Sequence, residues 1–189
     1  MTGYVIPRLP VSAGALLWDG EGRLLVLHPT YKAGWTLPGG QVEADGETPW
    51  EGCRREVAEE TGLDVVAGRL VCVDFLRPRP PRDDGWERPG GLRLLFDCGV
   101  VPSEAAASVV LQADELDDHR WADPGEVDGL LSGPLRRRVR RTLGAGLSGP
   151  GTAGPGTLYL EDGRPVAGVG WAGSMPSAAR KRSGASDMG

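Results

Sequence analysis

The sequence predicts an α+β fold in which helices pack on a mixed β-sheet. Strand-like apolar runs come first, one helix-like segment interrupts them, and two more helix-like segments follow the run at 116–121. This order lacks the regular alternation of strands and helices that builds a doubly wound parallel sheet. The chain has 189 residues, 40% hydrophobic and 25% charged, so one ordinary packed domain is expected.

The predicted strands are short apolar runs that end at turn-forming residues. Asp19 and Gly20 separate the first two runs, and an Asp-Gly pair between such runs favours a hairpin. Pro38, Gly39 and Gly40 are expected to stop the third run. The runs span residues 11–18, 23–28, 35–37, 65–76, 92–101 and 116–121.

A helix is predicted over residues 48–61, because apolar residues recur there at the spacing of one helix face. Thr48 is a suitable N-cap before Pro49, and Gly62 is a suitable residue to end the helix. The core-facing positions are Trp50, Cys53 and Val57. Residues 124–131 and 134–143 are also predicted to be helical, and five of the residues in the second are arginines.

The chain holds 30 glycines and 16 prolines, and the glycines crowd its last quarter. Residues 144–156 are therefore expected to form a flexible linker. Residues 157–171 are expected to add a β-hairpin that turns at Asp162-Gly163, and residues 172–189 a disordered tail. Residues 77–91 are rich in proline, glycine and charge, which predicts a long loop.

Composition excludes several classes of protein. A net charge of −5 gives no general attraction to the nucleic acid backbone, and no apolar run is long enough to span a membrane. The three cysteines are odd in number and lack metal-site spacing, which favours a reduced, cytoplasmic setting. The N-terminus has no apolar segment typical of a secretion signal.

The helix at 48–61 carries three carboxylates on one face. Glu56, Glu59 and Glu60 fall within an arc of about 100°. Like charges so close destabilise a helix, so a compensating partner is expected. Hard divalent cations such as Mg²⁺ or Mn²⁺ prefer oxygen ligands and often share them with substrate phosphates. A solvated acidic face is the alternative.

The acidic face belongs to a longer pattern, residues 39–63, which read GGQVEADGETPWEGCRREVAEETGL. A Gly-rich turn, a glutamate, Arg-Glu and a closing Glu-Glu-x-Gly resemble the Nudix box, found in the MutT-like hydrolases. The resemblance implies an α/β/α sandwich with a mixed central sheet, and hydrolysis of a nucleoside diphosphate linked to another group, with Mg²⁺ or Mn²⁺. Six residues separate Gly40 from Glu47, one more than in the family pattern.

The resemblance also implies roles for single residues. Glu56, Glu59, Glu60 and the carbonyl of Gly40 match metal ligands, whereas Gly39, Glu47, Arg55 and Gly62 match structural positions of the box. Beyond the box, Trp35-x-x-Pro-Gly-Gly and a Glu115-Leu116 segment extend the match to residues 8–143. Because family members differ in their general base, Glu56 and Glu115 are both candidates for it.

The substrate is left open between nucleotide sugars, dinucleoside polyphosphates and nucleoside triphosphates. Trp35 and Trp86 are candidates for stacking on a base, although a core position fits Trp35 at least as well. Arg77 and Arg79 are candidates for binding phosphate, although a solubilising loop is favoured over this role. The expected partner is a small nucleotide or other diphosphate, with no nucleic acid or membrane partner and with a homodimer left open. A non-catalytic nucleotide sensor and a diphosphate isomerase are the alternative functions.

Overall fold

The computed structural model describes residues 8–80, 90–151 and 154–169. Its centre is a mixed sheet with the strand order β6-β2-β1-β5-β4-β7-β8, and β3 pairs separately with β1. The strands are β1 (Val11–Trp18), β2 (Leu24–Pro29), β3 (Gly39–Gln41), β4 (Arg69–Leu76), β5 (Gly91–Val100), β6 (Leu116–Ala122), β7 (Leu158–Glu161) and β8 (Arg164–Pro165). The helices are α1 (Pro49–Thr61), α2 (Ser103–Ala106), α3 (Pro124–Leu130) and α4 (Gly133–Gly144).

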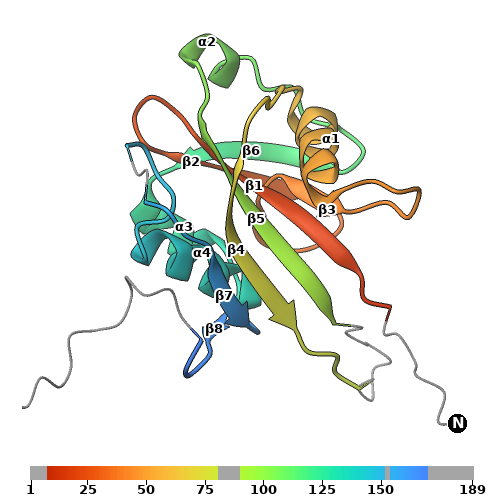
Figure 1. Ribbon diagram of the computed structural model, residues 1–189. Helices are drawn as coiled ribbons and strands as arrows, with labels where there is room; N and C mark the ends of the chain where they lie inside the picture. The colour runs from red at the N-terminus through yellow and green to blue at the C-terminus, as the bar shows by residue number, and fades with distance from the viewer. Residues whose placement is uncertain (1–7, 81–89, 152–153, 170–189) are drawn as a thin grey trace, which may run out of the picture.

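Helices cover both faces of the sheet, with α1 on one side and α3 and α4 on the other (Figure 1). Alternate residues of β1 supply the two cores: Leu16 and Trp18 face α3 and α4, whereas Ala15 and Leu17 face α1. The predicted α+β class and the sandwich that the family resemblance implies are confirmed. Within the described residues, none of the helices has the length and apolar character to cross a membrane.

The hairpin between β1 and β2 forms as its turn residues predict. The carboxylate of Asp19 accepts hydrogen bonds from the backbone N–H groups of Glu21 and Arg23, each at 2.9 Å. Trp18 then pairs with Leu24 in antiparallel register. The Asp side chain therefore closes the turn by satisfying backbone donors that the sheet leaves free.

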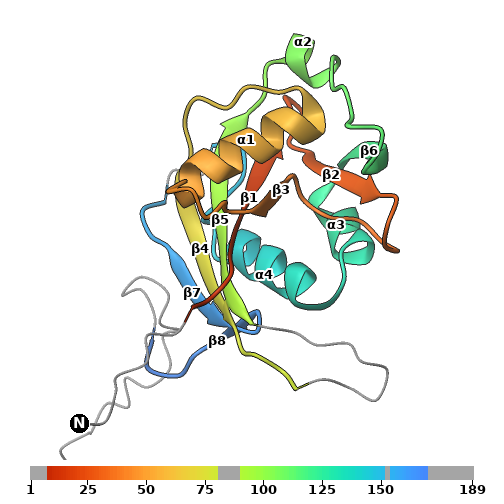
Figure 2. The same cartoon turned by 90° about the vertical axis from the view of Figure 1, so that its right-hand side faces the viewer.

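Helix α1 begins and ends where the sequence predicts. Thr48 and Glu51 form a reciprocal capping box at its start, and Gly62 ends it in the left-handed conformation with φ 71°. Cys53 and Val57 are fully buried, and Trp50 packs at a tilt on Phe96 of β5. These contacts dock α1 across β1, β3 and β5 (Figure 2).

Three expectations about the elements were wrong. Residues 35–37 form no strand and make only one bridge, between Thr36 and Leu27. The third strand is instead Gly39–Gln41, the segment expected to end it, because pairing with β1 outweighs the low strand propensity of glycine. Strand β4 begins at Arg69 rather than at residue 65, and the short helix α2 was not predicted.

Gly39 allows this close pairing. Its φ is +136°, and a Cβ there would lie 2.3 Å from the carbonyl oxygen of Ala13. We expect Gly39→Ala to lower the free energy of unfolding by roughly 2–5 kcal/mol, from backbone strain and overpacking together. Urea denaturation of this variant measures the loss.

Gly34→Ala is the matched control for that prediction. Gly34 also has a positive φ, +88°, but a Cβ there would meet nothing within 4 Å. Its loss should therefore be near 1 kcal/mol, from backbone strain alone. Equal losses in both variants would refute the close approach at Gly39.

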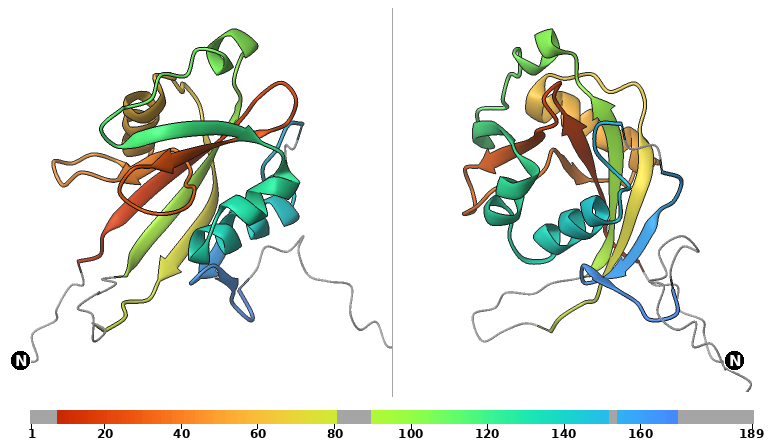
Figure 3. Two further views of the ribbon diagram at one scale, coloured as in Figure 1. Left: turned by 180° about the vertical axis from the view of Figure 1, so that it is seen from behind. Right: turned by 90° about the vertical axis from the view of Figure 1, so that its left-hand side faces the viewer.

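Residues 158–165 extend the central sheet. Strand β7 pairs in parallel with β4 and turns back through Asp162-Gly163 into β8 (Figure 3). Two residues of the expected flexible linker at 144–156 pack on the domain: Leu147 is buried, and the Ser148 hydroxyl accepts a hydrogen bond from Trp18 Nε1 at 3.1 Å. The expected tail at 172–189 lies outside the described residues.

Candidate active site

The carboxylate of Glu60 is the most buried of the three on the acidic face of α1. Only 7% of the residue is exposed, and one of its oxygens accepts a hydrogen bond from the backbone N–H of Gly39 at 2.7 Å. Burial raises the pKa of Glu60 to about 7, and the negative charges of Glu56 and Glu115 act in the same direction against the Gly39 hydrogen bond. The hydrogen bond from Gly39 in β3 therefore does not offset the cost of burying the negative charge of Glu60.

Glu56 lies one helix turn before Glu60 and rests against Gly40. A Cβ on Gly40 would lie 2.3 Å from the carboxyl carbon of Glu56, so the absent side chain makes room for this carboxylate. Burial raises the pKa of Glu56 although the charge of Arg55 opposes the shift. Two glutamates with raised pKa values thus face the Gly39-Gly40 backbone.

Arg55 holds the helix to the loop before it. Its guanidinium donates to both carboxylate oxygens of Glu47, at 2.8 and 3.2 Å, and to the carbonyl of Gln41 at 3.1 Å. The pKa of Glu47 is lowered mainly by these side-chain hydrogen bonds. Gly52, which the sequence analysis did not single out, leaves the space for Glu47, because a Cβ there would lie 2.9 Å from that carboxylate.

Glu59 points to the same guanidinium. Arg55 Nη1 donates to Glu59 at 2.9 Å and to Glu56 at 3.1 Å, and the side chain of Glu59 is half exposed. Arg55 therefore partly neutralises three glutamates around the loop–helix junction but donates no hydrogen bond to Glu60. The excess negative charge is concentrated on the side of Glu60.

A distant segment brings Glu115 to this cluster. The N–H groups of Val110 and Gln112 donate to the last carbonyls of α1, those of Thr61 and Glu60, at 3.0 and 3.4 Å. Thr30, just after β2, donates to the carbonyl of Glu115 at 2.9 Å. Glu115 consequently lies close enough for its charge to raise the pKa values of both Glu56 and Glu60.

A family model described as the NUDIX domain matches residues 8–143, which cover this whole arrangement. The chain belongs to the Nudix family.

Known relatives agree with this assignment. A MutT-like protein from Streptomyces ambofaciens is 42% identical over 141 residues, 74% of this chain and 81% of that protein. The NAD-capped RNA hydrolase NudC of Stutzerimonas stutzeri is 30% identical over 138 residues, 72% of this chain but only 44% of NudC. The MutT protein of Methanosarcina mazei Go1 has a similar structure, with a TM-score of 0.59 and 26% identity, covering 72% of this chain and 94% of that one. The expectation of a Nudix hydrolase is thus confirmed at the level of the family.

The described candidates for substrate binding, Trp35, Arg77 and Arg79, have neighbours elsewhere in this Nudix domain. The ring of Trp35 is flanked by His28, edge-on with centroids 5.3 Å apart, and by the guanidinium of Arg120 at 5.3 Å. Arg77 forms an ion pair with Glu161 of β7, and Arg79 is exposed. Trp86 lies outside the described residues. None of these contacts joins the glutamate cluster.

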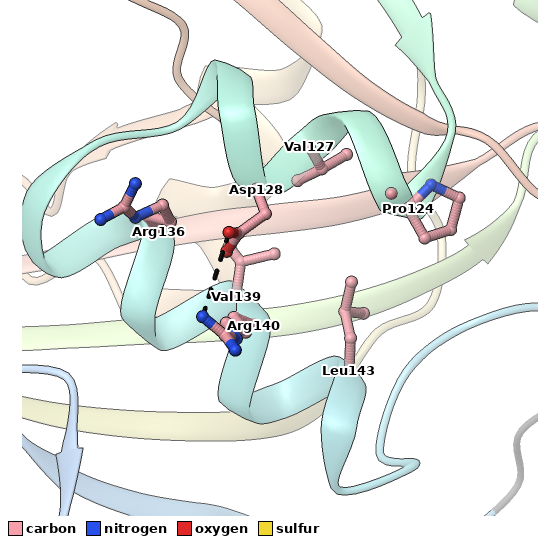
Figure 4. A pocket seen from close by; sticks show the side chains of 8 residues that line it. Pro124, Val127, Asp128, Arg136, Val139, Arg140 and Leu143 are labelled. Atoms are coloured by element: carbon pink, nitrogen blue, oxygen red, sulfur yellow. Dashed lines mark ion pairs between the residues drawn. The ribbon is translucent and has the colours of Figure 1, made fainter.

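A groove of about 320 Å³ opens between α3 and α4 of the Nudix domain (Figure 4). Asp128 faces Arg140 across it, with 4.0 Å between the carboxylate and guanidinium atoms. Its apolar floor includes Val127 and Val139, which belong to the core on the sheet face opposite α1. The groove is therefore separate from the glutamates.

Proposed function

We propose that the protein is a metal-dependent hydrolase that cleaves the diphosphate linkage of a nucleoside diphosphate derivative or a nucleoside triphosphate. The observation that carries the proposal is the placement of Glu56 and Glu60 beside the backbone of Gly39 and Gly40, with Glu115 close enough for its charge to raise the pKa of both. Raised pKa values at grouped carboxylates are typical of a site that works with a cation or moves a proton. Family membership supports the same reaction class.

The donor groups suit Mg²⁺ or Mn²⁺. Glu56, Glu59, Glu60 and the Gly40 carbonyl offer only oxygen atoms, which hard cations prefer. Within the part of the chain that the structure describes, no three acidic, histidine or cysteine side chains already stand in a ligand arrangement. Glu59 accepts a hydrogen bond from Arg55 and would have to turn to take part. When bound, the cation would polarise water and neutralise the diphosphate oxygens.

Within this proposal Glu115 is the general base. Its residue is exposed at the start of β6, and its carboxylate makes no hydrogen bond or ion pair with another described residue. Glu56, the other candidate, already accepts a hydrogen bond from Arg55. A free carboxylate beside the cluster is better able to take a proton from the attacking water. Arg55 and Glu47 keep the loop and helix in place.

Gly40→Ala tests the position of Glu56. The new methyl group would displace the Glu56 carboxylate, the mobile end of a side chain, so we expect kcat to fall by about tenfold or more. The free energy of unfolding should change by less than about 1 kcal/mol. Steady-state kinetics with urea denaturation checks both; an unchanged kcat would contradict a role for Glu56 at this position.

Release of phosphate and nucleotide from a panel of compounds tests the function itself. The panel contains ADP-ribose, a dinucleoside polyphosphate, the nucleoside triphosphates and an NAD-capped RNA, each with Mg²⁺, with Mn²⁺ and with a chelator. Cleavage that needs a metal supports the proposal, and the products identify the broken bond. Absence of cleavage across the panel would refute it, and tight binding of one compound would then favour the sensor.

The isomerase alternative needs a cysteine at the site. Cys53 and Cys72 are fully buried, and Cys98 packs against the core beneath α1. Burial raises the pKa of Cys72 to about 12, and contact with Cys53 raises that of Cys98. These thiols are core residues, so the hydrolase is favoured.

A further inference from the structure

Tyr31 is the most exposed aromatic residue in the described part of the chain, with 68% of its surface in solvent. The tryptophans that the structure describes are engaged within the protein. Trp18 donates to Ser148 and Trp121 to the carbonyl of Ala106, while Trp50 packs on Phe96. The Tyr31 hydroxyl makes no hydrogen bond to another described residue. Packing within the protein therefore does not account for an aromatic ring at this position.

The neighbours of Tyr31 place it at the rim of the candidate active site. The preceding residue, Thr30, is fixed to the carbonyl of Glu115 by its backbone N–H at 2.9 Å and by its hydroxyl at 3.2 Å. These bonds hold the start of the loop between β2 and β3 against the segment that carries Glu115. Partial burial raises the pKa of the Tyr31 hydroxyl, and the negative charges of Glu60, Glu115 and Glu56 raise it further.

Lys32 adds a positive charge beside the Tyr31 ring. Its ammonium lies 5.3 Å from the centre of the Tyr31 ring, a distance at which a cation is attracted to an aromatic ring. The same ammonium lies close enough to Glu60 for its charge to favour the ionised carboxylate. Lys32 thus places a positive charge beside the glutamate cluster, where an anionic substrate would otherwise be repelled by the carboxylates.

We propose that Tyr31 is the platform on which the substrate's heterocycle stacks, and that Lys32 binds its phosphate. The inference rests on the proposed function and assigns the residues that hold the base and the phosphate of its nucleotide substrate. Stacking accepts every base because each has a π-face, so purine and pyrimidine nucleotides should bind with similar affinity. Trp35, the candidate from the sequence, is partly buried and packs against the core on the other face of the sheet, whereas Tyr31 is exposed.

Calorimetric titration with ADP and with inorganic diphosphate, both with Mg²⁺, tests the proposal. We expect Tyr31→Ala to weaken ADP binding by about 5-fold to 100-fold, the range that loss of one stacked base gives, and to leave diphosphate binding unchanged. Tyr31→Phe should keep the affinity for ADP within about twofold, since it keeps the ring. Lys32→Met should weaken both ligands by a similar factor.

Tyr159→Ala is the matched control, because Tyr159 is also exposed but lies on β7 beside Glu161. It should bind both ligands as the unmodified protein does. Equal ADP affinity in Tyr31→Ala and the unmodified protein would overturn the proposal, as would failure of the unmodified protein to bind either ligand. If ADP binding depends on Tyr31 but no compound is hydrolysed, the platform stands and the hydrolase function fails.

Discussion

Glu60→Gln is expected to remove most turnover and at the same time to stabilise the metal-free protein at pH 8. Glu60 is a proposed metal ligand, and loss of a ligand that supports several kcal/mol of charge stabilisation lowers kcat by roughly 100-fold or more. The amide oxygen of Gln can still accept the hydrogen bond from Gly39, so the fold should persist. Steady-state kinetics and thermal unfolding in chelator measure the two effects.

The stabilisation follows from the raised pKa of Glu60, about 7 in the folded chain against an ordinary value of 4.5. Between these pH values the folded state holds more protons than the unfolded state, so stability falls as pH rises through this window. Above pH 7 the full penalty is present, and Gln removes up to about 3 kcal/mol of it. The Tm in chelator should rise by up to roughly 6–12 °C at pH 8 and by almost nothing at pH 4.5.

Two further variants separate the loss of turnover from the gain in stability. Glu59→Gln should also lose most turnover, but without the gain in Tm, because the Glu59 side chain is half exposed. Glu104→Gln on α2, exposed and not among the charges that shift the pKa values of Glu56 and Glu60, should change neither quantity. Near-normal rates in both Glu59→Gln and Glu60→Gln would reject the assignment of metal ligands. A Tm for Glu60→Gln below that of the unmodified protein at pH 8 would contradict the destabilisation assigned to the buried charge of Glu60.

Arg138→Met is expected to produce the largest loss of stability. The Arg138 guanidinium donates twice to the fully buried carboxylate of Asp74, at 3.0 and 2.9 Å, and joins α4 to β4. Removing one partner leaves the other charge buried, which destabilises a protein by about 3–5 kcal/mol. The remaining Gly163 N–H, at 2.9 Å from Asp74, cannot replace a charge. Urea denaturation measures the loss.

Arg141→Met is the matched control, with the same substitution on an exposed position of the same helix. It should change the free energy of unfolding by less than about 0.5 kcal/mol. Because Asp74 and Arg138 pack on the sheet face opposite α1, kcat per folded molecule should be normal in both variants. Similar free energies of unfolding for the two variants would show that the buried ion pair between Arg138 and Asp74 does not stabilise the fold.

Elements with local signals could be predicted from the sequence. A helix cap and a hairpin turn are decided by hydrogen bonds between residues a few positions apart, as Thr48 with Glu51 and Asp19 with Arg23 illustrate. Strand β3 could not be predicted, because its glycines lack the alternation that marks a strand and pair only when β1 is beside them. The hairpin of β7 and β8 forms around the predicted Asp162-Gly163 turn, but its pairing with β4 depends on a strand edge many residues earlier.

The candidate site divides in the same way. The sequence alone determined which carboxylates share one face of α1, and the family to which the chain belongs, because helix spacing and the box are properties of neighbouring residues. Only the tertiary structure decided that Glu115, Tyr31 and Lys32 reach those carboxylates, and that Gly39 and burial hold Glu60 with a raised pKa. The physical reason is that burial and electrostatic neighbours are set by segments far apart in the chain, which only the folded sheet brings together.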